Sequence, residues 1–137
     1  MDSMTLKDFE QIIYVRNEIK ELSKRLKKVS GSNFVADWVN DYSTGEARPI
    51  SISGYDIADP EKVKKILILL ERQKESLEDM VFEAEHFIAS LPDSKIRMLL
   101  TLRFIEGLEW NEAAKRTYKK MTGDSARMSV VRFFGRS

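Results

Sequence analysis

The chain has 137 residues, of which 42% are hydrophobic, 33% are charged and none is cysteine. This length allows one compact domain, or a small domain with an extended element, and excludes two large cores. No apolar run approaches the roughly 18 residues that a membrane span needs, and no basic and apolar leader opens the chain. The lack of cysteine excludes disulfide frameworks and cysteine-based zinc sites. We therefore expect a cytoplasmic protein with no membrane partner.

The charges are unevenly distributed, although the net charge is only +1. Residues 1–92 contain 13 lysines and arginines against 17 acidic residues, whereas residues 93–137 contain 10 against 5. A basic segment behind an acidic body favours a polyanionic partner for the basic segment. Chance fluctuation in a highly charged chain is the alternative.

The first predicted helix covers residues 5–29. Its apolar residues alternate at spacings of three and four, which is the pattern of a coiled-coil seam: Ile12, Val15, Ile19, Leu22, Leu26 and Val29. Leu6, Phe9 and Ile13 form a neighbouring stripe, so we expect the beginning of this helix to contact a further element.

A second helix is predicted over residues 60–90, after Asp59 as N-cap and Pro60 as first helical residue. It has the same type of seam: Val63, Ile66, Leu70, Gln73, Leu77, Met80, Ala84, Phe87 and Leu91. Two such helices can bury their seams in an antiparallel hairpin, which defines a first domain over residues 1–91.

The connection over residues 30–59 is long for a helical hairpin and carries many apolar residues. Residues 34–42 have the spacing of a short helix, and residues 48–55 alternate like a short strand. We expect a partly ordered cap on the hairpin; a ligand-binding insert is the alternative.

Residues 92–137 predict a second domain of three short helices. The first is capped by Asp93 or Ser94 and ends near Glu106 and Gly107. The second covers residues 109–117. The third follows the lysine-rich residues 118–123, with Asp124 as N-cap, and ends near Phe134. The fold class is therefore all-α, an antiparallel long-helix hairpin followed by three helices of the helix-turn-helix type.

A family resemblance rests on Leu91-Pro92 and on the run from Leu99 to Lys115, LLTLRFIEGLEWNEAAK. This run resembles the fourth, promoter-recognising region of bacterial sigma factors, in which a Leu-Pro step precedes a leucine-rich helix with an Arg-aromatic pair, a Glu-Gly-Leu turn and an aromatic residue before an Ile-Ala step. The resemblance covers some 45 residues. With the heptad helices in front, the whole chain resembles phage and prophage transcription regulators of the RinA and ArpU types.

This resemblance implies that the last helix binds DNA. Ser125 and Arg132 match its Thr/Ser and Arg positions, and Arg127 matches a basic one. Helical spacing places Ser125, Met128, Ser129 and Arg132 on one face, which would enter the major groove. Phosphate contacts are expected from basic residues before this helix and at the end of the chain: Lys115, Arg116, Lys119, Lys120 and Arg136. The opposite face, with Ala126, Val130, Val131, Phe133 and Phe134, should pack on Leu100, Phe104 and Trp110.

The chain departs from the sigma pattern between Ala114 and Ser125, where it has about two additional residues. Tyr118 stands where a turn glycine is usual, and Arg116 and Thr117 replace aliphatic residues. The position of the last helix in a groove is therefore the least constrained part of the resemblance. Trp110 is expected to pack in the core rather than to stack on a base. For Tyr118 two interpretations stay open: packing within the turn, or contact with a phosphate.

No catalytic or metal site is expected. Glu83 and His86 form one Glu-x-x-His step, whereas a di-iron helical bundle needs two such steps, and His86 is the single histidine. Neither a phosphate-binding glycine loop nor a paired nucleophile and base is present. We therefore expect a protein that is not an enzyme and needs no cofactor.

The expected function is sequence-specific binding of double-stranded DNA in the cytoplasm of a bacterial host, as a transcription regulator. Residues 5–91 would form a homodimer or contact another protein, RNA polymerase being one candidate. Two alternatives remain: a protein-interaction module without DNA binding, and a DNA-packaging recruiter of the small-terminase type.

Overall fold

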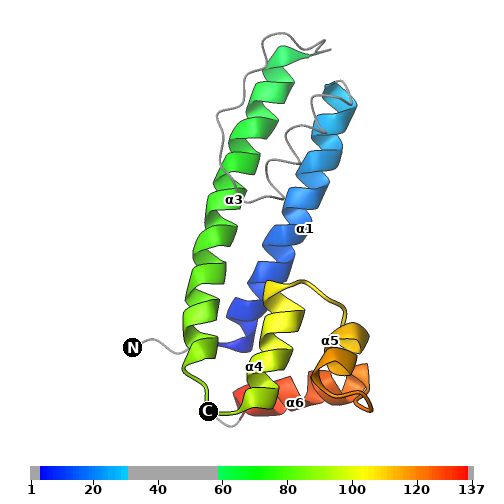
Figure 1. Ribbon diagram of the computed structural model, residues 1–137. Coiled ribbons are helices and arrows are strands. Elements are labelled where there is room, and N and C mark those ends of the chain that lie inside the picture. Colours follow the sequence, from blue (N-terminus) through cyan, green and yellow to red (C-terminus); the bar gives the residue numbers. More distant parts are fainter. Residues whose placement is uncertain (1–3, 31–58, 136–137) are drawn as a thin grey trace. The chain divides into compact units, whose positions relative to one another are not determined.

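The computed structural model describes residues 4–30 and 59–135, and all regular structure in these ranges is helical (Figure 1). The predicted all-α class is thereby confirmed for this part of the chain. The short helix and strand predicted within residues 34–55, and Arg136, lie outside the described residues. None of the described helices is long and apolar enough to cross a membrane.

Two long helices account for most of the described chain. Helix α1 covers Leu6–Val29 and helix α3 covers Pro60–Ala89, so both predicted helices are confirmed to within a residue or so at each end. Thr5 and Asp8 start α1 with a reciprocal pair of bonds: each backbone N–H donates to the other's side chain, at 2.9 and 3.2 Å. At the start of α3 the N–H of Lys62 donates to Asp59 Oδ1 at 3.2 Å, which confirms Asp59 as the cap.

The predicted seam positions are mostly buried. In α1 the buried seam residues are Ile12, Val15, Ile19 and Leu26; in α3 they are Val63, Ile66, Leu70, Leu77 and Ala84. The chain divides into two compact units, Met1–Val15 with Leu77–Ser137 and Arg16–Ser76, so each unit contains a segment of both long helices. The antiparallel hairpin and a domain boundary at residue 92 stay predictions.

Four short elements follow in the first unit: α4 (Ser94–Leu100), the π-helical turn η1 (Thr101–Ile105), α5 (Trp110–Thr117) and α6 (Gly123–Gly135). Helices α4, α5 and α6 pack against one another. Their shared core consists of side chains that are almost fully buried: Ile96, Leu99, Leu100, Phe104, Ala113, Ala114, Ala126 and Val130.

An aromatic cluster joins the beginning of α1 to these elements. The ring of Phe9 is fully buried, and its centroid lies 5.3 Å from that of Phe104, 5.6 Å from that of Phe134 and 5.8 Å from that of Phe87. This confirms that the beginning of α1 contacts a further element. The ring of Phe134, which the sequence assigns to the inner face of the last helix, contacts the rings of Phe9 and Phe87.

Candidate nucleic-acid interface

The sequence predicted one helix from Asp93 or Ser94 to Glu106, whereas the structure has the α-helix α4 followed by the π-helical turn η1. Asp93 caps α4, because its Oδ1 accepts from the N–H groups of Lys95 and Ile96 at 2.9 and 3.2 Å. From Thr101 the backbone widens into the π-helical turn, in which the N–H of Glu106 donates to the carbonyl of Thr101 at 2.9 Å. Gly107, with φ 80°, then ends it, as predicted.

Arg103 and Trp110 fix the junction between η1 and α5. Arg103 donates from Nη1 to the carbonyl of Leu108 at 2.9 Å, and its guanidinium lies 5.2 Å from the centroid of the Trp110 ring. The indole also meets Phe104 edge-on, at 5.9 Å between centroids. Trp110 is therefore a packing residue at the base of α5, which matches the expectation that it belongs to the core.

Helices α5 and α6 approach each other closely at Gly123, the first residue of α6. A Cβ atom added there would lie 2.1 Å from Asn111 Oδ1 and 3.0 Å from the backbone nitrogen of Asn111. Any side chain at this position would push the two helices apart or displace Asn111. The sequence pattern did not single out Gly123, because it stood at the end of the lysine-rich turn; the signal was a small residue one position before a predicted helix start.

The start of α6 differs from the prediction by one residue, and Asp124 is not its N-cap. Thr122 has this role: its Oγ1 accepts from the N–H of Ser125 at 3.1 Å, and its carbonyl accepts from the N–H of Ala126 at 3.0 Å. The turn before it is closed by a bond of 2.9 Å from the N–H of Met121 to the carbonyl of Tyr118. This turn places the first helical residue at Gly123, so Asp124 is already inside the helix.

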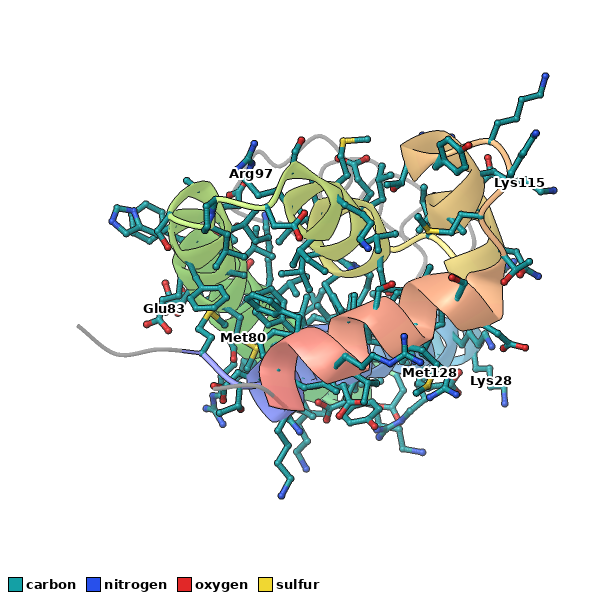
Figure 2. All side chains as sticks on the ribbon, turned by 90° about the horizontal axis from the view of Figure 1, so that it is seen from below. Lys28, Met80, Glu83, Arg97, Lys115 and Met128 are labelled. Carbon is teal, nitrogen blue, oxygen red and sulfur yellow. The ribbon has the colours of Figure 1, made fainter. Side chains whose placement is uncertain are left out.

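Helix α6 has one buried face and one outer face. Ala126 and Val130 are fully buried on the inner side. On the opposite side Ser125 and Arg132 are exposed, Met128 is half-buried, and Ser129 lies half-buried at the margin. The structure thus brings together the residues that the sequence assigned to one face, and Figure 2 shows Met128 directed away from the body on the outer side of α6. Asp124 shares this face and is also exposed.

Four exposed cations lie on α5 and on the turn that follows it; we call them the α5 basic group, and they are Lys115, Arg116, Lys119 and Lys120. Figure 2 shows Lys115 extending into solvent. Arg116 is partly compensated, because its Nε lies 3.4 Å from Glu112 Oε1. The other three have no acidic partner within the described residues, so most of the positive charge of this group faces outward.

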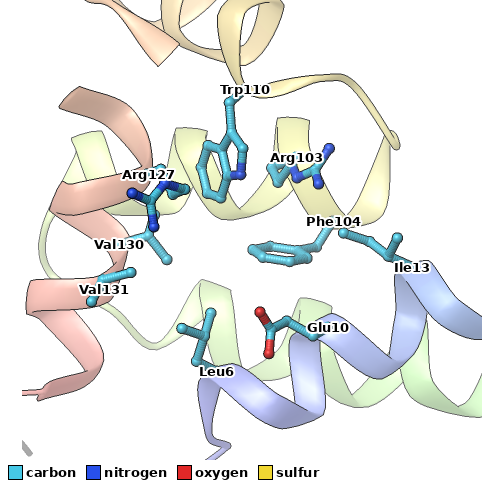
Figure 3. Close-up of a pocket in the computed structure, with 9 residues that line it drawn as sticks. All are labelled: Leu6, Glu10, Ile13, Arg103, Phe104, Trp110, Arg127, Val130 and Val131. Carbon is cyan, nitrogen blue, oxygen red and sulfur yellow. The ribbon is translucent and has the colours of Figure 1, made fainter. Parts of the chain in front are cut away.

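Arg127 lies apart from the outer face of α6. It lines a cavity of about 90 Å³ with Glu10 of α1, Arg103 and Trp110, among others (Figure 3). Its position is about 100° around the helix from Ala126, between the buried and outer sides. The sequence grouped Arg127 with the DNA-contacting residues, whereas the structure places it at the flank that adjoins α1.

Tyr118 is 60% exposed, so most of its side chain is not covered by the turn. Together with Met98, Met121, Ser94, Lys95 and Thr117 it lines an open groove of about 390 Å³ at the side of α4.

Comparison of the chain with protein-family models, with curated proteins and with solved structures found no match.

Proposed function

We propose that the chain binds double-stranded DNA sequence-specifically through α6 and regulates transcription, as a phage or prophage protein in the cytoplasm of its bacterial host. The observation that carries this proposal is the outer face of α6. It is polar and presents Arg132 together with Asp124, it belongs to a short helix fixed from behind by apolar packing, and it lies close in sequence to a group of exposed cations.

The outer face fits the chemistry of the major groove. A helix with its side chains fits the width of that groove. Arg132 can donate to O6 and N7 of one guanine, and Ser125 and Ser129 can bond to a base edge or a phosphate. Met128 offers an apolar surface for the methyl group of thymine. Asp124 can accept from the amino group of cytosine.

The α5 basic group suits the DNA backbone, because lysine and arginine contacts to phosphate position a protein without selecting sequence. Arg136, directly after α6, has the same chemistry. Arg127 is exposed and also lines the cavity beside Glu10, so we keep it as a predicted DNA contact at the flank of α6.

One copy presents a small interface, so tight binding benefits from a second. We propose a homodimer through residues 5–91, which would hold two DNA-binding ends on one particle and raise the affinity of the pair. RNA polymerase is the further partner that a transcription regulator of this type would contact.

A protein-interaction module is the second candidate. The groove beside Met98 and Tyr118 favours it, because these side chains are 40% and 60% exposed and would be covered by an apolar partner. In this alternative the helices keep their fold and DNA is not bound.

Selection of bound fragments from bacterial and prophage genomic DNA, with the full chain at low salt, separates the two candidates. Enrichment of a shared sequence supports DNA recognition. No enrichment and no retardation of any fragment contradicts it and favours the interaction module.

Replacing Lys119 with alanine tests the phosphate contacts. With about five such contacts, the logarithm of the binding constant should fall with the logarithm of salt at a slope of roughly −4 to −5, and Lys119→Ala should reduce that slope by about one unit on every sequence. Lys20→Ala, which removes an exposed lysine of α1, is the matched control and should leave the slope unchanged.

A further inference from the structure

The outward side of α3 carries a second, exposed seam. Its residues are spaced alternately by four and three, as in a coiled coil, and all are exposed: Glu61, Lys65, Ile68, Arg72, Glu75, Asp79, Phe82 and His86. Two of them are large apolar residues, Ile68 at 57% exposure and Phe82 at 70%. The ring of Phe82 stacks on that of His86, with centroids 6.2 Å apart. We call this set the outer seam.

The charges along α3 are divided into two blocks. Residues 60–74 contain five lysines and arginines and two acidic residues, whereas residues 75–89 contain five acidic residues and neither lysine nor arginine. The sign changes between Lys74 and Glu75, at the middle of the helix. On the outer seam itself the first half carries Lys65 and Arg72 against Glu61, and the second half carries Glu75 and Asp79, so a complementary partner is acidic opposite the first half and basic opposite the second.

We propose that the outer seam is the interface between two copies of this chain, whose α3 helices pair antiparallel about a two-fold axis near residues 73–74. A second copy of α3, turned end to end, has the required charges in the required order. Parallel pairing would instead place each block against its own sign, which is unfavourable. The proposal rests on the homodimer of the proposed function and gives that dimer a surface and a direction.

The spacing of the outer seam fixes the register. In an antiparallel pair, the steps of four and three residues along one outer seam can be aligned with the same steps on the other. Arg72 of each copy then lies opposite Glu75 of the other copy, so this pair occurs twice. In the same register Lys65 lies opposite Phe82, where an ammonium group can sit over the ring. Ile68 of one copy lies opposite Asp79 of the other copy, and the next pair along the seam is Arg72 with Glu75. The apolar residues thus lie at both ends of a charge-paired centre.

Charge exchange at the centre tests the pairing. Sedimentation of the full chain at micromolar concentration should show a dimer. Arg72→Glu or Glu75→Arg alone should weaken the dimer at least about tenfold, because each places like charges together at two symmetric places. The double variant Arg72→Glu/Glu75→Arg should restore it. Lys20→Glu, an exposed reversal on α1, should have no effect, and circular dichroism should show unchanged helix in every variant.

Cross-linking tests the direction, and the absence of cysteine makes single introductions unambiguous. In the antiparallel pair the two copies of position 75 lie near the axis, whereas those of position 82 are about 25 Å apart along it. Glu75→Cys should therefore form a covalent dimer on mild oxidation and Phe82→Cys should not. Equal cross-linking at both positions would indicate parallel helices and overturn the proposal.

Two further results would also overturn it. One is a monomer at all concentrations tested. The other is a dimer that tolerates Arg72→Glu, which would mean that another part of the chain forms the interface. Retardation of DNA fragments by the same samples tests DNA binding independently of dimer formation. A monomer that binds DNA contradicts only the dimer. A dimer that does not bind DNA contradicts only the DNA interface.

Discussion

Gly123 controls how closely α5 and α6 approach. The nearest atoms to a Cβ at this position would be the side-chain oxygen and the backbone nitrogen of Asn111, at 2.1 and 3.0 Å. The oxygen can move with its side chain, but the nitrogen is part of α5. The restriction therefore belongs to the backbone of the helix pair.

Gly123→Ala should lower the free energy of unfolding by about 1–3 kcal/mol, because the added methyl group overpacks this contact. Gly135→Ala is the matched control in the same helix, since no atom lies within 4 Å of a Cβ there; its effect should stay within about 0.5 kcal/mol. Urea unfolding followed by circular dichroism measures both. Equal stability of the two variants would contradict the close approach.

At the scale of elements, the long helices could be predicted and the short ones only in part. The seams of α1 and α3 repeat over many turns, and Asp59-Pro60 marks a start with little ambiguity. The break of α4 into η1 has no such signal, because the residues of Thr101–Ile105 suit an α-helix equally well. Likewise the start of α6 depended on which side chain, that of Thr122 or that of Asp124, accepts the N-cap hydrogen bond from the first turn of the helix.

The two candidate caps of α6 can be compared directly. Thr122→Ala removes the hydroxyl that accepts from the N–H of Ser125 and should lower the free energy of unfolding by about 0.5–2 kcal/mol. Asp124→Ala should cost less than Thr122→Ala, because no cap bond is lost and only its attraction to the helix N-terminus disappears. Thermal unfolding of the two variants side by side provides the measurement. A larger loss of stability in Asp124→Ala than in Thr122→Ala would indicate that Asp124 is the N-cap.

At the scale of the whole molecule, contacts distant in sequence decide what the C-terminal helices rest on. The stripe of Leu6, Phe9 and Ile13 predicted that α1 has a further neighbour. It could not name that neighbour, because Phe9 meets residues more than 70 positions away. The outer face of α6 was predictable from helical spacing alone, whereas the place of Arg127 at the α1 flank required the packing of α1 on α6.

Phe9→Ala should lower the free energy of unfolding by about 3–5 kcal/mol, since a fully buried ring with three aromatic neighbours is removed. Tyr14→Ala, on the same helix and 54% exposed in the native chain, should change it by less than about 1 kcal/mol. The midpoint of guanidinium unfolding distinguishes them. A small loss at Phe9 would mean that α1 contributes little to the stability of this unit.

The central claim is that the outer face of α6 recognises DNA sequence, and one comparison tests it most directly. The affinity of Arg132→Ala is measured on the selected sequence and on a scrambled sequence of equal length, beside that of the native chain. The account predicts a loss of about 1–3 kcal/mol on the selected sequence and almost none on the scrambled one, because Arg132 would contact a base. An equal loss on both sequences, or no loss on either, would contradict base recognition by this face.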